Sequence, residues 1–217
     1  MKAITRVILE KSINRHPDLE RCRGGIEQAY EAWLACCRSG GAILTCGNGG
    51  SAADSLHIVG ELVKGFALPR PIANELRQRL VDVDLELGAD LAPLLQTPIR
   101  AQSLVAEAAL VTAVANDNDA AAIYAQQVLA HGRAGDVLVA ISTSGNSKNV
   151  INAAIAAKAL GLSVVALTGP SGGRLANFAD VAILAPGSTT FEIQELHLPI
   201  YHALCLMLEA EVFGDDV

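Results

Sequence analysis

Asp136-Val137-Leu138-Val139-Ala140-Ile141 runs directly into Ser142-Thr143-Ser144-Gly145-Asn146-Ser147, and this stretch decides the fold class. A short apolar run is typical of a strand that is buried on both faces of a parallel sheet. The polar turn that follows it leads into a helical apolar pattern over residues 147–160. A strand, a Ser- and Gly-rich turn and a helix in this order predict an α/β fold with a ligand loop beyond the carboxyl end of the strand.

The same alternation extends from this stretch in both directions. We expect further strands at 42–46, 102–106, 163–168 and 181–184. Helices are expected at 2–14, 18–38, 51–65, 119–131 and 190–212, with another that ends at 116–119 and a short one after Gly172-Gly173. Residues 66–98 contain four prolines, and we expect short helices in an insertion there. Strands that alternate with helices predict a parallel sheet covered on both faces.

The bulk composition limits the function classes. Hydrophobic residues make up 51% of the 217 residues and aromatic residues 4%, which suits helices packed on a sheet. The net charge of −7 argues against direct binding of nucleic acid, which needs a basic surface. No apolar run of membrane length is evident, so no membrane contact is expected. The five cysteines form no C-x-x-C pair and no signal peptide is recognisable, so we expect reduced thiols in a cytoplasmic protein.

Two loops carry the predicted chemistry. Ser142, Thr143, Ser144 and Ser147 supply four hydroxyls within six residues, and each hydroxyl can donate to a phosphate oxygen. The alternative is an N-capping turn, but one hydroxyl suffices for a cap. The other loop, 47–51, is rich in glycine and also precedes a helix, where unpaired N–H groups favour an anion. Together the loops predict a site for the phosphate of a small molecule.

The first loop has a rival interpretation. Gly47, Gly49 and Ala52 fit the dinucleotide pattern G-x-G-x-x-G/A, which is weak when it stands alone. That pattern also requires a second strand with a terminal acid about 20 residues further on. Residues 66–75 are broken by proline and show no such strand, which disfavours a nicotinamide or flavin cofactor. The phosphate-binding motif G-x-x-x-x-G-K-[ST] does not occur in the chain.

At these loops the chain resembles the SIS (sugar isomerase) domain family and, more narrowly, the phosphoheptose isomerases. The resemblance lies in segments spread over most of residues 40–212, namely 46–51 with His57 and Glu61, 116–117, 135–147, 167–169, and 194–197 with His202. It implies a flavodoxin-like three-layer αβα sandwich, a single SIS domain over 1–217 with a central five-stranded parallel sheet. Residues 1–39 would be N-terminal helices for packing and oligomerisation, and residues 65–100 an insertion.

The resemblance also implies a reaction, an aldose–ketose isomerisation of sedoheptulose 7-phosphate to D-glycero-D-manno-heptose 7-phosphate through an enediol. Glu61 would be the general base and His202 the general acid. One zinc ion per subunit would be held by His57, Glu61, Gln194 and His202. The sugar and its phosphate would contact Asn48, Gly49, Gly50, Ser51, Glu61, Asn116, Asp117, Ser142, Thr143, Ser144, Ser147 and Gln194. The protein would be a homotetramer with its active sites near the subunit interfaces.

The spacing of the four implied ligands supports only part of this set. His57 and Glu61 are four residues apart and therefore share one helix face. Gln194 and His202 are eight apart, which is roughly 12 Å along a straight helix. A bend at Pro199, or ligands from more than one element or chain, would relieve this separation.

Two alternatives remain open in the sequence. One is an isomerase or lyase of another sugar phosphate, because the long segment 65–100 departs from the simple heptose isomerases and could remodel the pocket. The other is a non-catalytic SIS module that senses a sugar phosphate or binds a partner such as a replication initiator. The serine loop is common to all of these proteins, so it predicts a phosphate site without naming the reaction.

Overall fold

Five parallel strands form the centre of the computed structural model, which describes residues 1–214; the last three residues of the expected domain lie outside the described residues. The strands are β1 (Ile43–Cys46), β2 (Ala101–Ser103), β3 (Val137–Ser142), β4 (Ser163–Thr168) and β5 (Val181–Leu184), in the order β2-β1-β3-β4-β5. This is the flavodoxin-like order, which reverses between β1 and β3. The predicted fold class is confirmed.

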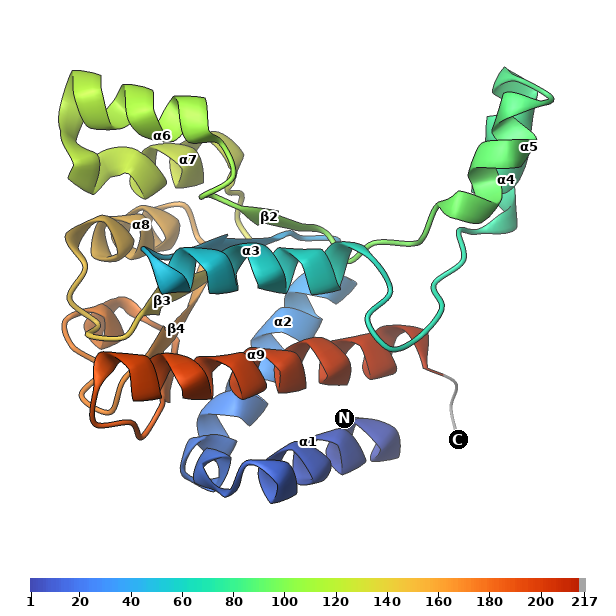
Figure 1. The fold of residues 1–217 in the computed structure, drawn as a ribbon. Helices are drawn as coiled ribbons and strands as arrows, with labels where there is room; N and C mark the ends of the chain where they lie inside the picture. Colours follow the sequence, from blue (N-terminus) through green and yellow to red (C-terminus); the bar gives the residue numbers. More distant parts are fainter. Residues whose placement is uncertain (215–217) are drawn as a thin grey trace.

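Alternating side chains of each strand build two separate cores. Val137, Val139 and Ile141 of β3 face one core, whereas Leu138 and Ala140 face the other. The first core lies under α1 (Ala3–Arg15), α2 (Arg23–Arg38), α3 (Gly50–Val63) and α9 (Thr190–Phe213). The second lies under α6 (Ala108–Val114), α7 (Ile123–His131) and α8 (Lys148–Ala159). The helices therefore cover both faces of the sheet (Figure 1). Because both faces are buried, apolar residues predominate in the strands.

The last helix, α9, supplies much of the first core. It begins with a capping box in which Thr189 and Glu192 each bond the other's backbone N–H. The helix has 24 residues, and an 18-residue segment of it has a mean hydropathy of 1.2, which is long and apolar enough for a membrane span, contrary to the expectation that the chain holds no such run. In the structure 61% of that segment is buried inside the protein. Its apolar character is accounted for by packing against α1, α2 and α3.

Several expected boundaries are shifted. The second strand begins at Ala101 rather than Gln102 and ends at Ser103, because only three residues pair with the short strand β1. The helix expected from residue 18 starts as a 3-10 helix, Pro17–Cys22, before α2. The segment expected to join two helices at 116–119 is a π-helical turn, Ala115–Asp119, followed by a 3-10 turn, Ala120–Ala122. A 3-10 helix, Leu175–Phe178, stands where the short helix was expected.

The expected insertion contains short helices, as predicted. They are α4 (Asn74–Val83), α5 (Leu87–Leu91) and a 3-10 turn, Ala92–Leu94. Together they form a helical hairpin that projects from the body of the molecule (Figure 1). An antiparallel bridge between Pro71 and Gln96 joins the two ends of the hairpin at its root.

All five cysteines are free thiols. Four are buried and Cys37 is half-buried. Burial raises the pKa of the Cys46 thiol to about 12. The cysteines therefore pack as small apolar side chains.

Candidate functional site

The two predicted loops lie side by side at the point where the strand order reverses. The glycine loop follows β1 and the serine loop follows β3, and these two strands are paired neighbours. Ligands of open parallel sheets bind beyond the carboxyl ends of the strands at such a point. The structure thus places both loops where a ligand site is expected.

The glycine loop is fixed by side chains of α7 and α8. Asn48 and Asn149 exchange two amide hydrogen bonds of 2.8 and 2.9 Å, which tie this loop to the helix after the serine loop. The hydroxyl of Tyr124 donates to the carbonyl of Gly47. Gly49 has a φ of +57°, which only glycine adopts readily. Sequence reasoning missed Tyr124 and Asn149, although Asn149 stands only two residues beyond the predicted loop.

The serine loop leaves hydroxyls available rather than using them as a cap. Ser147 is the N-cap of α8, yet its side chain makes no capping hydrogen bond. Its hydroxyl instead lies 3.1 Å from that of Ser142. Ser144 is exposed and Thr143 is half-buried. At Gly145, with a φ of +63°, a Cβ would collide with the backbone of a neighbouring loop. This arrangement favours an anion at the start of α8 over the capping alternative.

A cluster around His57 forms the second part of the candidate site. The Nε2 of His57 lies 3.1 Å from Oε1 of Glu61, and Lys64 donates to the other carboxylate oxygen at 2.9 Å. Partial burial raises the pKa of Glu61, but the hydrogen bonds and charges of Lys64 and His57 outweigh it and leave the pKa lowered. Glu61 is therefore ionised at neutral pH, with 12% of its side chain exposed.

Tyr201 connects this cluster to Asp54. Its hydroxyl lies 2.9 Å from Nδ1 of His57 and donates to Asp54 at 3.3 Å. Burial is the main cause of the raised pKa of Asp54. Sequence reasoning missed both residues. Asp54 precedes His57 by three residues and shares its helix face, so that spacing was a usable signal.

His202 lies beside this network. Its ring is 5.0 Å from that of His57, centroid to centroid, and 5.4 Å from that of Phe66. Among the described residues, its Nε2 is buried without a hydrogen-bond partner. Burial and the nearby His57 lower the pKa of His202, which favours a neutral imidazole at neutral pH. Beyond its ring opens a hollow of about 560 Å³, which Phe66 and Arg15 also line.

Gln194, the fourth predicted zinc ligand, contacts α3 at its first turn and hydrogen-bonds Asp54 on the same helix as His57. α9 continues as one helix through Pro199, and the amide of Gln194 lies over Gly50, at the first turn of α3. Within the described part of this single chain, no group of three or more His, Cys, Asp or Glu side chains is arranged to hold a metal ion. No formed zinc site is therefore seen in the described chain, and the set of four ligands stays a prediction, for which the unpartnered Nε2 of His202 is a suitable donor.

The remaining predicted contacts lie at the margins of the site. Ser51 is buried in the first turn of α3, next to the glycine loop. Asn116 and Asp117 are exposed in the π-helical turn and bond each other at 2.8 Å. Their contact with a sugar stays a prediction.

His197 is fully buried with its Nε2 3.2 Å from the carbonyl oxygen of Thr168, and burial lowers its pKa to about 4. His197 therefore has a structural role.

Known proteins are similar to this chain in sequence. A family model of the SIS domain matches residues 13–80 and 89–169. A phosphoheptose isomerase of Laribacter hongkongensis is 37% identical over 222 residues, which cover 100% of both chains. One of Sulfurimonas denitrificans is 38% identical over 192 residues, which cover 88% of this chain and 85% of the other.

Two solved structures share the fold closely. That of a phosphoheptose isomerase from Neisseria gonorrhoeae has a TM-score of 0.73 and 34% identity, and the match covers 93% of this chain and 94% of the other. That of a phosphoheptose isomerase from Francisella tularensis has a TM-score of 0.73 and 31% identity, and the match covers 96% and 98%.

Proposed function

This chain belongs to the SIS-domain family and, within it, to the phosphoheptose isomerases, and from this premise we propose that it converts sedoheptulose 7-phosphate to D-glycero-D-manno-heptose 7-phosphate. The observation that carries the proposal is the pairing of a phosphate loop with a carboxylate–imidazole cluster. An isomerisation of a sugar phosphate needs a site that binds the phosphate and positions the sugar. It also needs a general base and a general acid next to the sugar carbonyl.

We assign the base to Glu61. It removes a proton from C1, the electron pair forms the C1=C2 bond of an enediol, and the C2 carbonyl oxygen gains a proton. Return of the proton to C2, with loss of the proton on O1, completes the aldose. The lowered pKa of Glu61 keeps it ionised and ready to accept a proton at neutral pH.

We assign the acid to His202. In the tautomer that carries a proton on Nε2, the imidazole can donate to the C2 oxygen and later receive the proton from O1. The absence of a partner for that nitrogen among the described residues supports this role. A neutral imidazole serves as such a donor when its pKa is lowered, and burial lowers the pKa of His202.

The phosphate is assigned to the two loops. Thr143, Ser144 and Ser147 would donate to its oxygens, and the start of α8 would contribute its backbone N–H groups. Asn48 would contact the sugar from the glycine loop, with Asn116 and Asp117 at its margin. Hydroxyls and amides bind phosphate without net charge, which suits an acidic chain.

We further propose one zinc ion per subunit, with His57, Glu61, Gln194 and His202 as candidate ligands in an assembled protein. Because the described chain holds no formed group of three His, Cys, Asp or Glu ligands, the proposal requires that assembly of several copies completes the ligand set. That requirement supports a homotetramer with active sites near the interfaces. Zinc would polarise the sugar oxygens, but a zinc-bound carboxylate is a weaker base, so no step is assigned to the metal.

The proposed setting is the cytoplasm, with a small sugar phosphate as ligand and neither nucleic acid nor membrane as a partner. The net charge of −7 and five free thiols support this setting.

An assay with purified protein and sedoheptulose 7-phosphate tests the function. Formation of the aldoheptose 7-phosphate is expected, and metal analysis of the same preparation should find about one zinc per chain. Loss of turnover on chelation, with recovery on adding zinc, supports the metal proposal. Tight binding of the substrate without turnover would contradict the isomerase and favour a sensor, whereas turnover of a different sugar phosphate alone would revise the substrate.

A further inference from the structure

The projecting hairpin of α4 and α5 has no support from the body of the protein. α4 contains no buried residue, and Gly88 is the only buried residue of α5. Gly88 is buried by the hairpin itself, because a Cβ there would collide with the carbonyl oxygen of Leu80. Isolated helices of five and ten residues are marginal in water. The hairpin therefore needs a neighbour that covers it.

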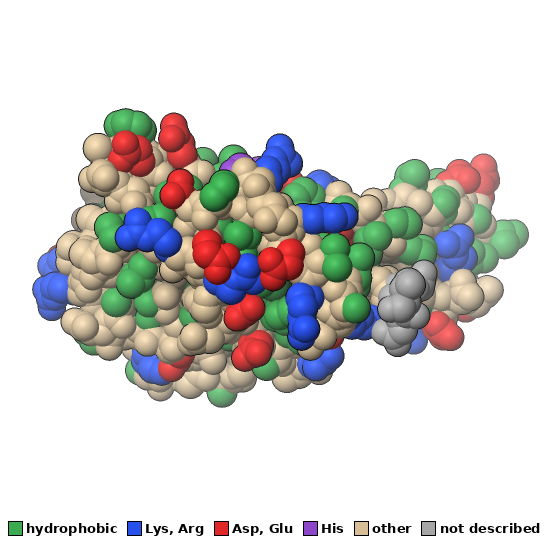
Figure 2. Space-filling model, turned by 90° about the horizontal axis from the view of Figure 1, so that it is seen from below, with side chains coloured by type: hydrophobic (Ala, Val, Ile, Leu, Met, Phe, Trp, Pro, Cys, Tyr) green, Lys and Arg blue, Asp and Glu red, His purple; other side chains and the backbone are tan. Residues whose placement is uncertain are grey.

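Each helix of the hairpin presents an apolar stripe to solvent. The stripes follow helical spacing and consist of Leu76 and Val83 on α4, next to the half-buried Leu80, with Leu87, Leu91 and Leu94 extending from α5. Val83 is 88% exposed, Leu87 70% and Leu94 76%. Seen from the α1 side, hydrophobic side chains gather on the projecting part of the molecule at the right (Figure 2). Exposed apolar groups in such a cluster mark an interaction surface.

The hairpin is also acidic. Residues 74–94 contain five acidic and two basic side chains. Asp82, Glu86 and Asp90 are exposed and enter no ion pair within the described chain. The matching surface should therefore be apolar along its middle and basic at its edges.

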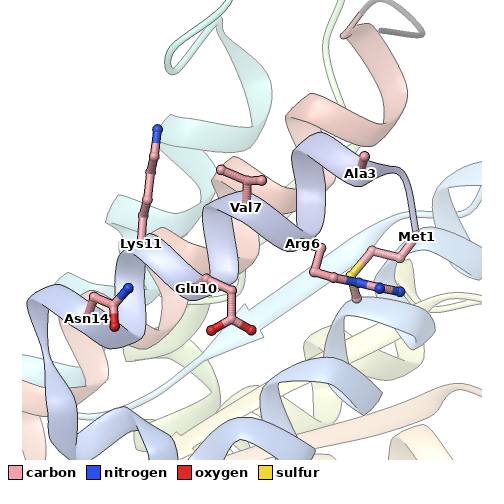
Figure 3. Close-up of a pocket in the computed structure, with 7 residues that line it drawn as sticks. All are labelled: Met1, Ala3, Arg6, Val7, Glu10, Lys11 and Asn14. Carbon is pink, nitrogen blue, oxygen red and sulfur yellow. The ribbon is translucent and has the colours of Figure 1, made fainter.

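The outer face of α1 has these properties. It carries a hollow of about 550 Å³ lined by Met1, Ala3, Arg6, Val7, Glu10, Lys11 and Asn14 (Figure 3). Residues 3, 7, 10 and 14 are spaced by four, three and four positions, so they line one face of α1. Coiled-coil helices pack against each other along faces with this spacing. The hollow lies on a different helix from the proposed catalytic groups, which are on α3 and α9.

The charge of this face is opposite to that of the hairpin. Arg23 binds the carboxylate of Glu10 at 2.6 and 3.0 Å and that of Glu20 at 2.9 Å. Counted together with Arg6 and Lys11, these side chains carry three positive and two negative charges. Arg6 and Lys11 flank the face that residues 3, 7, 10 and 14 line, and neither enters an ion pair among the described residues. In a chain of net charge −7, this is a locally basic surface.

We propose that the α4–α5 hairpin of one copy docks on the outer face of α1 of a second copy. The hairpin projects away from α1 of its own chain (Figure 1), and its root is fixed. Thr97 donates its N–H to the carbonyl of Arg70 at 2.6 Å and its hydroxyl to that of Pro71 at 2.9 Å. The inference is independent of the reaction that the protein catalyses.

Charge reversal tests the docking in the full-length protein. One variant, Glu86→Lys/Asp90→Lys, reverses the hairpin, and another, Arg6→Glu/Lys11→Glu, reverses the face of α1. Each should raise the dissociation constant of the assembly at least about tenfold in sedimentation velocity, because like charges would meet. The control Glu31→Lys/Glu107→Lys makes the same change of charge as the hairpin variant, at exposed sites elsewhere, and should leave the assembly unchanged. Circular dichroism should show all variants folded.

Mixing the two variants gives the sharper result. When a hairpin-reversed chain meets an α1-reversed chain, both contacts again join opposite charges, so the mixture should assemble as the wild type does. Failure to recover on mixing would overturn the pairing of these two surfaces. A wild-type protein that is monomeric at micromolar concentration would overturn the docking altogether. So would a monomer that sediments with phosphatidylcholine–phosphatidylserine vesicles through Val83 and Leu87.

Discussion

Arg70 and Glu209 form an ion pair that is buried from solvent, with side-chain exposures of 0% and 1% and a separation of 2.7 Å. The guanidinium of Arg70 also donates to the carbonyl oxygens of Leu62 and Glu61 at the end of α3. The carboxylate of Glu209 accepts N–H groups of residues 66–68, at distances from 2.7 to 3.1 Å. This pair therefore joins α3, α9 and the root of the hairpin. It holds the backbone of Glu61 and that of Phe66, which packs on His202.

Breaking this pair should destabilise the protein strongly. Arg70→Met leaves the carboxylate of Glu209 buried without its partner, and we expect the free energy of unfolding to fall by about 3–5 kcal/mol. Urea denaturation measures this change. The exposed Arg133→Met serves as the control, with an expected effect within about 0.5 kcal/mol. A loss below about 1 kcal/mol for Arg70→Met would show that the pair contributes little.

Glu61→Gln should lower kcat by about 10²–10⁴-fold, the range for loss of a general base. Binding of the substrate should persist, because the phosphate loops are unaltered. Steady-state kinetics and isothermal titration calorimetry measure the two effects. Glu107→Gln, at an exposed carboxylate outside the site, should leave kcat unchanged. Full activity of Glu61→Gln would remove Glu61 from the mechanism.

Replacing two hydroxyls of the serine loop should weaken binding of the phosphate. Ser144→Ala/Ser147→Ala removes two donors, each with an expected contribution of about 1.5–3 kcal/mol to a charged group. The KM for the sugar phosphate and the inhibition constant for inorganic phosphate should both rise, by at least about tenfold. Ser163→Ala is the control, since Ser163 is exposed at the start of β4. An unchanged inhibition constant would place the phosphate elsewhere.

Glu211 should make stability depend on pH in the acid range. Burial raises its pKa, but hydrogen bonds from the backbone N–H of Lys2 and the hydroxyl of Thr5, at 2.8 and 2.9 Å, outweigh it. The pKa falls from 4.5 to about 2. A lowered pKa stabilises the folded state above pH 4.5, and this contribution is lost as the pH falls toward 2. At about 1.4 kcal/mol per pKa unit the full effect is about 3 kcal/mol.

Glu211→Gln tests this dependence. Unfolding free energies of the wild type should fall between pH 5 and 2 more steeply than those of the variant. The exposed Glu31→Gln should follow the wild-type curve. Parallel curves for Glu211→Gln and the wild type would refute the assignment.

Much of the fold could be predicted because its signals are local. The apolar runs of β1, β3 and β4 are continuous in the chain, and each is followed by its own turn and helix. The second strand was harder to place, since only Ala101–Ser103 pair at the sheet edge. Length and hydropathy alone do not distinguish α9 from a membrane span, because a core helix has the same composition.

The candidate site could be predicted only in part. His57 and Glu61 are four residues apart on one helix, so their contact follows from helix geometry. The spacing of Gln194 and His202 predicted a separation along the helix, and α9 continues as one helix through Pro199. Tyr201 could not be placed from the sequence, since its contact with His57 spans 144 positions.

The sequence by itself determined the parallel α/β fold, the two loops beyond β1 and β3, and the pairing of His57 with Glu61. Each depends on neighbours within a few residues, where backbone geometry fixes the outcome. Only the tertiary structure decided that Arg70 is buried against Glu209, 139 positions away, and that Gln194 covers Gly50. Only the structure showed that the segment predicted as an insertion projects as an exposed hairpin. Such contacts depend on how whole helices pack, and helix packing is set by side chains far apart in the chain.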